Sequence, residues 1–302
     1  MSSHTLGAEP AAEQALPRAA RSLRHDAWRR FRRHRLALGG LGVLVVLTLA
    51  VLLGPVVLGI DPQAIDFGAK DEGPSLAHPM GTDELGRDQL VRVLVGGRLT
   101  LAVAGAAVLA SIVVGVLVGA IAGYAGGVLD NALMRLVDVF YSLPGLFVVI
   151  LLVTLVGAGF VTIVAAIAFF TWMNTARLVR ASYLSLKEME YVEAARTIGV
   201  GDVKIAIRHI LPNALTPVIV SATLGIATAI LIESALSFLG LGFQPPRATW
   251  GGMLNESQNA VINQGHWWRG FFPGMMIFVT VLAVNYVGDG LRDALDPRRA
   301  ER

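Results

Sequence analysis

The chain has 302 residues, of which 54% are hydrophobic and only 16% are charged, with a formal net charge of +3. The apolar residues fall in long runs rather than at alternating positions, which indicates a membrane protein and not a soluble domain. Cysteine is absent, so a disulfide framework, thiolate catalysis and a cysteine-ligated metal are all excluded.

An arginine-rich segment, residues 1–35, precedes the first apolar run. Its eight arginines are Arg18, Arg21, Arg24, Arg29, Arg30, Arg32, Arg33 and Arg35. They fit either a topology anchor beside anionic membrane lipid or a docking site for another protein or a nucleic acid. We favour the lipid anchor and expect no nucleic-acid partner. Residues 1 to about 20 lack the aromatic and β-branched content needed to bury a core, so we expect them to be disordered.

The first charge-free run, from Leu36 to Ile60, is long enough to cross a bilayer. A spanning helix needs roughly 20 predominantly apolar residues to cross a hydrocarbon core of about 30 Å. The run also exceeds the roughly 7–15 apolar residues of a cleaved signal peptide. We therefore predict a retained first span over residues 36–60, followed by an extracellular or periplasmic loop over residues 61–98.

Four further charge-free runs predict the remaining spans. They extend over Leu99–Leu129, Val139–Ala176, Ile210–Ile232 and Gly270–Gly288. The second of these would reach about 57 Å as a single helix, so we expect a hairpin of two spans broken near Gly157-Ala158-Gly159. The predicted fold class is an all-α membrane protein with six transmembrane helices. It has a core of spans 2–6 over residues 99–291, an outer loop over 242–269 and a tail over 292–302.

Lysine and arginine are distributed unevenly between the two sides of this topology. With six spans both termini share one side, and that side receives 19 of the 25 basic residues. The other six are Lys70, Arg87, Arg92, Arg98, Arg247 and Arg269. Because basic residues favour the cytoplasmic side, we predict that both termini and the connection between spans 4 and 5 are cytoplasmic.

A stripe of small residues marks the second span. Gly115, Gly119 and Gly123 recur every four residues and so lie on one face of a helix. Such a stripe lets two helix backbones approach closely inside a membrane, where no hydrophobic effect drives helices together. The sequence leaves open whether the partner helix belongs to this chain or to a second subunit.

The connection between predicted spans 4 and 5, residues 182–212, is amphipathic and too polar to span. An apolar stripe at helical spacing lies among its charges and consists of Tyr191, Ala194, Ala195 and Ile198. Such a stripe, rimmed by charge, suits a groove on a soluble partner.

A sharp bend is predicted in the middle of this connection. Gly199 stands where glycine can take a positive φ and end a helix, and Asp202 is well placed to cap the next helix. Leu211-Pro212 then marks re-entry into the bilayer, because proline is tolerated in a first helical turn. We expect two short helices that project from the membrane and move as one body with the spans on either side.

Enzymatic chemistry is not expected in this chain. A glycine-rich phosphate loop ends in a lysine preceded by glycine, and none of Lys70, Lys187 and Lys204 follows a glycine. The HExxH and GxSxG signatures of proteases are also missing. Any nucleotide site must therefore lie on another subunit.

An ion-driven carrier would need ionisable groups deep in the membrane, and only Glu233 is a candidate. It lies about 30 Å of helical rise beyond Asn213, close to the predicted outer interface. We leave two roles open for Glu233, a gate or substrate-path group and a solvated or partner-bonded structural carboxylate, and favour the structural one.

The outer segment GTDELGRD places Asp83, Glu84, Arg87 and Asp88 between turn-forming glycines. It fits either a docking surface for an extracellular substrate receptor, to which Asp83, Arg87 and Asp88 would contribute, or an internally satisfied loop.

Several segments together carry a family resemblance. They are HPMGTDELGRD (78–88), LVRASYLSLKEMEYVEAARTIG (178–199), RHILPN (208–213), ALSFLGLGFQPPRATWG (235–251) and GDGLRDALDPR (288–298). This set resembles the permease subunits of ATP-binding-cassette importers, and in particular the C-type subunit of the oligopeptide and dipeptide branch, over roughly residues 30–298. One position departs from the broader importer pattern: His209 replaces an apolar residue two positions before Leu211-Pro212.

The resemblance implies a type I importer-permease fold with a cytoplasmic coupling helix between spans 4 and 5. The surface entering a cleft on the ATPase would comprise Glu193, Ala194, Ala195, Arg196, Ile198 and Gly199, with Leu211 and Pro212 anchoring the next span. The implied partners are a second, homologous permease in a heterodimer, two ATPase subunits that hold ATP and Mg, and a substrate-binding protein facing the outer loops.

The resemblance also implies location and cargo. It places the chain in a prokaryotic plasma (inner) membrane, with no cofactor of its own, and implies alternating access that imports di- and oligopeptides. A related nickel or glutathione permease stays an alternative, and an ion-coupled secondary transporter is a remoter one.

Overall fold

The computed structural model describes residues 28–295, so the disorder expected for residues 1 to about 20 and the end of the predicted tail lie outside the described residues. The described part is helical, and its only strand-like feature is one isolated bridge between Thr82 and Asp88. Its main helices are α2 (Arg35–Leu58), α3 (Gln89–Ala125), α4 (Gly127–Tyr141), α5 (Gly145–Val156), α6 (Phe160–Leu186), α7 (Glu190–Thr197), α9 (Leu211–Phe238), α10 (Trp250–Gln264) and α11 (Trp268–Leu295).

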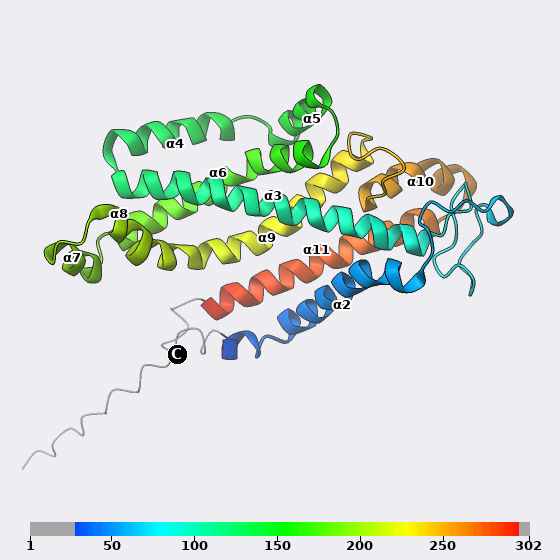
Figure 1. The fold of residues 1–302 in the computed structure, drawn as a ribbon, viewed down its shortest axis with the longest axis horizontal. Helices are drawn as coiled ribbons and strands as arrows, with labels where there is room; N and C mark the ends of the chain where they lie inside the picture. Colours follow the sequence, from blue (N-terminus) through cyan, green and yellow to red (C-terminus); the bar gives the residue numbers. More distant parts are fainter. Residues whose placement is uncertain (1–27, 296–302) are drawn as a thin grey trace, which may run out of the picture.

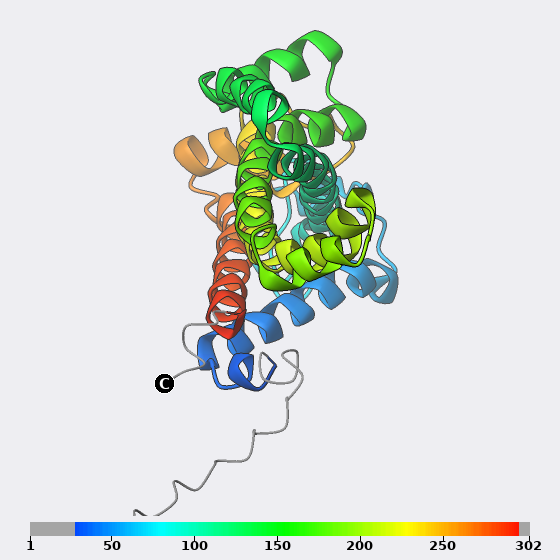
Figure 2. The same cartoon turned by 90° about the vertical axis from the view of Figure 1, so that its left-hand side faces the viewer.

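Five helices are long and apolar enough to cross a membrane: α2, α3, α6, α11, and α9 with the residues that precede it. They lie roughly alongside one another in Figure 1. Figure 2 looks at the bundle from one end. In this view α3, α6 and α9 occupy the centre, with α2 and α11 on one side and α4 and α5 on the other. The predicted all-helical fold is confirmed, with five spans, or six if the bent pair of α4 and α5 is counted as one.

The third predicted span is the one that differs from a simple helix. The break expected at Gly157 is present, since α5 ends at Val156, Gly157 has a φ of 95° and α6 begins at Phe160. A second break was not predicted: the chain turns by 80° between α4 and α5. Pro144, the N-cap of α5, has no N–H to continue α4 and disfavours helical backbone in the residue before it.

The helix that contains the second predicted span has other bounds than the charge-free run. Helix α3 begins at Gln89, not Leu99, because the Asp88 side chain accepts a hydrogen bond from the Val91 N–H at 3.1 Å and caps it. It ends at Ala125, before the predicted Leu129, where Gly126 takes a φ of 66°. The absence of charge reports the membrane-crossing part of a helix, whereas a cap decides where the helix starts.

The glycine stripe of α3 packs inside this chain. A Cβ atom on Gly115 would lie 2.8 Å from the Trp172 carbonyl oxygen, and one on Gly123 would lie 2.8 Å from the Arg180 carbonyl oxygen. The question left open by the sequence is therefore answered: the backbones of α3 and α6 meet along this stripe.

Helix α2 is held near its C-terminal end by an arginine of α3. Pro55 lacks an N–H, so the Val51 carbonyl loses the donor that an α-helix normally supplies. Arg98 replaces it: its Nε donates to the Val51 carbonyl at 2.8 Å and its Nη2 to the Leu52 carbonyl at 2.6 Å.

Candidate functional site: the elbow and the outer ion-pair cluster

The elbow, which we define as residues 190–212, projects at one end of the bundle (Figure 1). It consists of α7, a turn at Gly199 with a φ of 81°, the short α8 (Asp202–Lys204) and a π-helical segment η2 (Ile205–Ile210) that runs into α9. The predicted bend at Gly199 is thus present.

The second half of the elbow differs from the prediction. Asp202 does not cap α8; Gly201 occupies the N-cap, and the Asp202 carboxylate accepts a hydrogen bond from the Tyr124 hydroxyl at 2.6 Å. The second short helix is not separate either, because the helical stretch continues from Asp202 to Phe238. Pro212 cannot donate to the preceding turn, and the Leu211 N–H reaches back five residues to Ala206 instead, which is a π-type bond.

A small apolar core fixes the elbow to the spans. Val192 and Ala195 of α7 pack in one cluster with Ile205, Ile210 and Tyr183. The Tyr183 hydroxyl also donates to the Ala206 carbonyl at 3.0 Å. These contacts join α7 to α6 and to the helical stretch that continues into α9.

The outer surface of α7 presents the remaining apolar stripe. Tyr191, Ala194 and Ile198 are exposed, and 79% of Ile198 is accessible. Ala195, predicted in the same stripe, is buried and belongs to the inner core with Val192. The face available to a partner therefore excludes Ala195.

The other residues that the resemblance assigns to this surface are exposed or half-buried. Glu193, Arg196, Gly199 and Pro212 are exposed, and Leu211 is half-buried. Charged and apolar groups thus alternate on one rigid projection, which is the arrangement that a groove on a soluble protein can hold.

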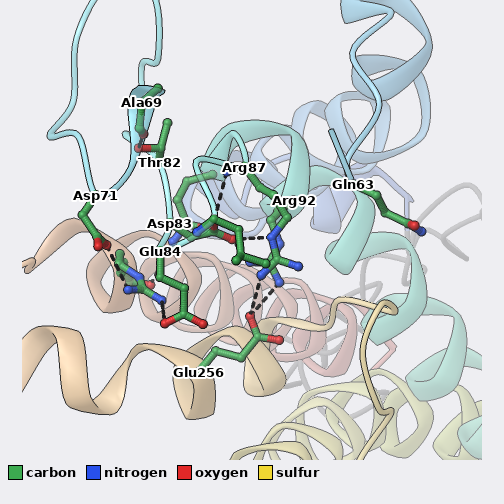
Figure 3. Close-up of polar contacts among 12 residues, drawn as sticks. Gln63, Ala69, Asp71, Thr82, Asp83, Glu84, Arg87, Arg92 and Glu256 are labelled. Atoms are coloured by element: carbon green, nitrogen blue, oxygen red, sulfur yellow. Dashed lines mark hydrogen bonds and ion pairs between the residues drawn. The ribbon is translucent and has the colours of Figure 1, made fainter. Parts of the chain in front are cut away.

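At the end of the bundle opposite the elbow lies an ion-pair cluster centred on Asp83 (Figure 3). The Asp83 carboxylate is buried, accepts from the backbone N–H groups of Leu85 at 2.9 Å and Arg87 at 3.0 Å, and pairs with the Arg87 side chain at 2.7 Å and with Arg92. Burial opposes ionisation of Asp83, but the Arg92 guanidinium and the two N–H groups outweigh it and hold the pKa of Asp83 below its usual value.

The cluster ties distant segments together. Arg92 of α3 also donates to Glu256 of α10 at 2.7 Å. Beside it, Arg269 of α11 pairs with Asp71 at 3.0 Å and with Glu84 at 3.5 Å. The loop before α3 is therefore fastened to α10 and α11.

The residues predicted to face a receptor are engaged within this cluster. Asp83 is buried, Arg87 keeps 13% of its side chain exposed, and Asp88 caps α3 while pairing with His78 at 2.9 Å. These contacts fit the alternative of an internally satisfied loop. Glu84 is the exposed acid of the segment, with 61% of its side chain accessible.

Two family models match the chain. The model described as "Binding-protein-dependent transport system inner membrane component" matches residues 115–301, and that described as "N-terminal TM domain of oligopeptide transport permease C" matches residues 22–79. The chain belongs to this permease family. It is an integral inner-membrane protein of a non-enzymatic subunit class, as its motifs predicted.

Relatives of the permease match it over nearly its whole length. It is 42% identical to the dipeptide transport system permease protein of Bacillus subtilis (strain 168), over 94% of this chain and 88% of the relative. It is 45% identical to the oligopeptide transport system permease protein of Escherichia coli (strain K12), over 92% of each. It is 41% identical to a glutathione transport system permease protein of Escherichia coli O6:K15:H31 (strain 536 / UPEC), over 93% of each.

A solved structure supports the fold. A chain of the MetNI methionine ABC transporter in inward-facing conformations superposes with a TM-score of 0.52 at 18% identity, over 68% of the permease and 96% of that chain.

Glu233 of the permease is enclosed by protein. Its side chain is fully buried in α9, and the Ser237 hydroxyl donates to its Oε1 at 2.7 Å, while Oε2 has no partner within residues 28–295. The solvated alternative for this carboxylate is therefore wrong and the partner-bonded one fits. Within the same described range, no group of three His, Cys, Asp or Glu could hold a metal ion.

Sequence reasoning missed the residues that give these sites their rigidity. Arg92 and Arg269 were used only as basic residues in the prediction of membrane orientation. In the structure the side chain of each is at most 5% exposed and pairs with acids distant in sequence. The only available signal was their position beside the ends of predicted spans. Val192 and Tyr183 carried no signal beyond an apolar or aromatic character.

Proposed function

We propose that this permease forms, with a second homologous permease, the path by which an ATP-driven importer takes up di- and oligopeptides. The dipeptide and oligopeptide permeases to which it is similar support the peptide substrate. The single observation that carries the proposal is the rigid elbow with its exposed stripe, because an elbow fixed to two spans can pass a movement of a soluble subunit to the membrane helices.

The energy source lies on partner subunits in this proposal. The permease has no phosphate loop, so two ATPase subunits hold ATP and Mg and receive Glu193, Ala194, Arg196, Ile198 and Gly199 in a cleft. ATP binding and hydrolysis then drive alternating access. A substrate-binding protein delivers peptide to the outer loops, where the ion-pair cluster keeps the docking surface in shape.

The elbow and both termini are cytoplasmic in this proposal. The distribution of Lys and Arg supports that orientation. The start of α2, the end of α11 and the elbow also lie toward the same end of the bundle in Figure 1.

The test is peptide uptake by the assembled importer in proteoliposomes. The wild-type complex should accumulate labelled peptide only with ATP and the binding protein. Glu193→Lys should abolish both uptake and the ATP hydrolysis that accompanies it, while membrane insertion stays normal. Normal transport by this variant would contradict the coupling role.

The same assay decides among the alternatives. Glutathione is a specific second candidate, because a glutathione permease is 41% identical; it would be accumulated in preference to other peptides. Proton-driven uptake by this chain alone would refute the importer proposal altogether.

A further inference from the structure

A cavity of about 180 Å³ lies between α3, α6 and α9, and the sites described above do not use it. Its polar side chains are Ser111, Thr171, Asn174, Thr175, Ser221 and Thr228, and the rest of its lining is apolar or glycine. No residue that lines it is charged. This differs from the outer end of the bundle, where arginines and acids dominate.

The cavity lies near the middle of the membrane. Ser111 is about 18 Å of helical rise from Leu99 and about 21 Å from the end of α3 at Ala125. Ser221 lies about 15 Å along α9 from Leu211. Both positions are well inside a hydrocarbon core of about 30 Å.

Four of its polar side chains make no hydrogen bond within residues 28–295. The hydroxyls of Thr171 and Thr228 follow the usual pattern in spans and donate to carbonyls of their own helix. The side chains of Ser111, Asn174, Thr175 and Ser221 have no such bond in the described structure. Asn174 is also exposed on its helix.

An exposed carboxamide at this depth is costly against lipid. An amide that loses its hydrogen bonds on entering hydrocarbon costs about 4–8 kcal/mol. Polar groups inside a membrane therefore face water or one another. Since Asn174 has no partner in the described chain, its surroundings in the assembled importer are water, a ligand or polar groups of the second permease, and only the first two leave the position open to a reagent and protectable by peptide.

The chemistry of the lining defines the ligand. A carboxamide and hydroxyls both donate and accept hydrogen bonds, which is what each peptide amide requires when it leaves water. Because no lining residue is charged, the cavity does not discriminate between ligands by the charge of their side chains. The lining contains no imidazole, carboxylate or thiolate to hold a nickel ion.

We propose that this cavity, between Ser111, Asn174 and Ser221, binds the amide backbone of a peptide in transit. The inference rests on the proposed function and adds the site within the membrane and the group it recognises. It also explains how one path passes peptides of different sequence, since every peptide carries the same backbone amides.

Because the chain contains no cysteine, an introduced cysteine is the only residue of this chain that a thiol reagent can label. Asn174→Cys and Ser221→Cys are introduced separately into the assembled importer and treated with a charged, membrane-impermeant thiosulfonate, which reacts with the hydrated thiolate. Thr48→Cys on the exposed surface of α2 is the control. We expect both cavity positions to react at least tenfold faster than Thr48→Cys, and excess peptide during turnover to slow them. Equal rates, or no protection by peptide, would overturn the proposal.

A second test compares a peptide with its ester analogue, in which one backbone N–H is replaced by oxygen. Asn174→Leu should lower uptake of the peptide about three- to tenfold, the worth of one hydrogen bond, and leave uptake of the ester analogue nearly unchanged. Thr48→Val should change neither.

The outcomes separate this inference from the proposed function. If the wild-type importer transports peptide but Asn174→Leu affects peptide and ester equally, the cavity does not bind the amide backbone while the proposed function stands. If the wild-type importer transports no peptide, both fail.

Discussion

Replacing Gly199 by alanine tests whether the shape of the elbow matters for coupling. Gly199 has a φ of 81°, and a Cβ atom there would meet nothing within 4 Å. The cost of alanine is therefore backbone strain alone, about 1–2 kcal/mol. A strain of about 1.4 kcal/mol lowers an equilibrium constant tenfold, so the ratio of the bent elbow to its other conformations falls by that factor.

The matched control lies two residues away. Gly201 has a φ of −65°, which any residue adopts, and a Cβ atom there also meets nothing within 4 Å. Gly199→Asn is an intermediate case, because asparagine tolerates positive φ better than alanine does.

The assay measures peptide-stimulated ATP hydrolysis and uptake by the reconstituted importer. We expect Gly199→Ala to lower both about tenfold, Gly199→Asn to lower them less, and Gly201→Ala to stay within twofold of wild type. The amount of each variant in the membrane should be unchanged. Equal activity of Gly199→Ala and Gly201→Ala would refute the reasoning, because the strain at positive φ arises only at Gly199.

Three further predictions concern the elbow, the outer cluster and α2. Ile198→Ser should weaken capture of the ATPase subunits in a pull-down without lowering the unfolding temperature, since Ile198 is exposed. Asp83→Asn should destabilise the chain by about 3 kcal/mol, whereas Glu84→Gln should have little effect on thermal unfolding. Because the pKa of Asp83 is depressed, its stabilisation is present above the unfolded pKa and is lost as pH falls through the folded pKa. Arg98→Met should cost about 1–3 kcal/mol by leaving the Val51 carbonyl unpaired, and adding Pro55→Ala should recover part of this loss in a double-mutant cycle.

The spans and the bend of the elbow were predictable because their causes are local. Length and absence of charge define a membrane-crossing helix, and Gly157 and Gly199 end helices through their own backbone conformation. The turn at Pro144 has a local cause too, but it lies inside an uninterrupted apolar run, so hydropathy did not reveal it.

The exposed and buried faces of α7 could not be separated from sequence. Val192 and Ala195 recur at helical spacing, as do Tyr191 and Ala194, and either pair could be the inner face. The core around Tyr183 decides between them, and it is assembled from three separate segments. For the same reason the bond from Arg92 to Glu256, which joins residues 164 positions apart, carries no sequence signal.

One continuous helical stretch connects the elbow, the cavity and the outer end of the permease. From Asp202 to Phe238 it has 37 residues, or about 55 Å. Its inner end is fixed by Tyr124, it contributes Ser221 to the cavity, and at its outer end the Phe238 carbonyl accepts from Asn255 of α10 at 2.6 Å. A rotation of the elbow therefore shifts the cavity wall and the contact with α10 together. Coupling of this kind needs no separate relay, because one helical stretch carries all three sites.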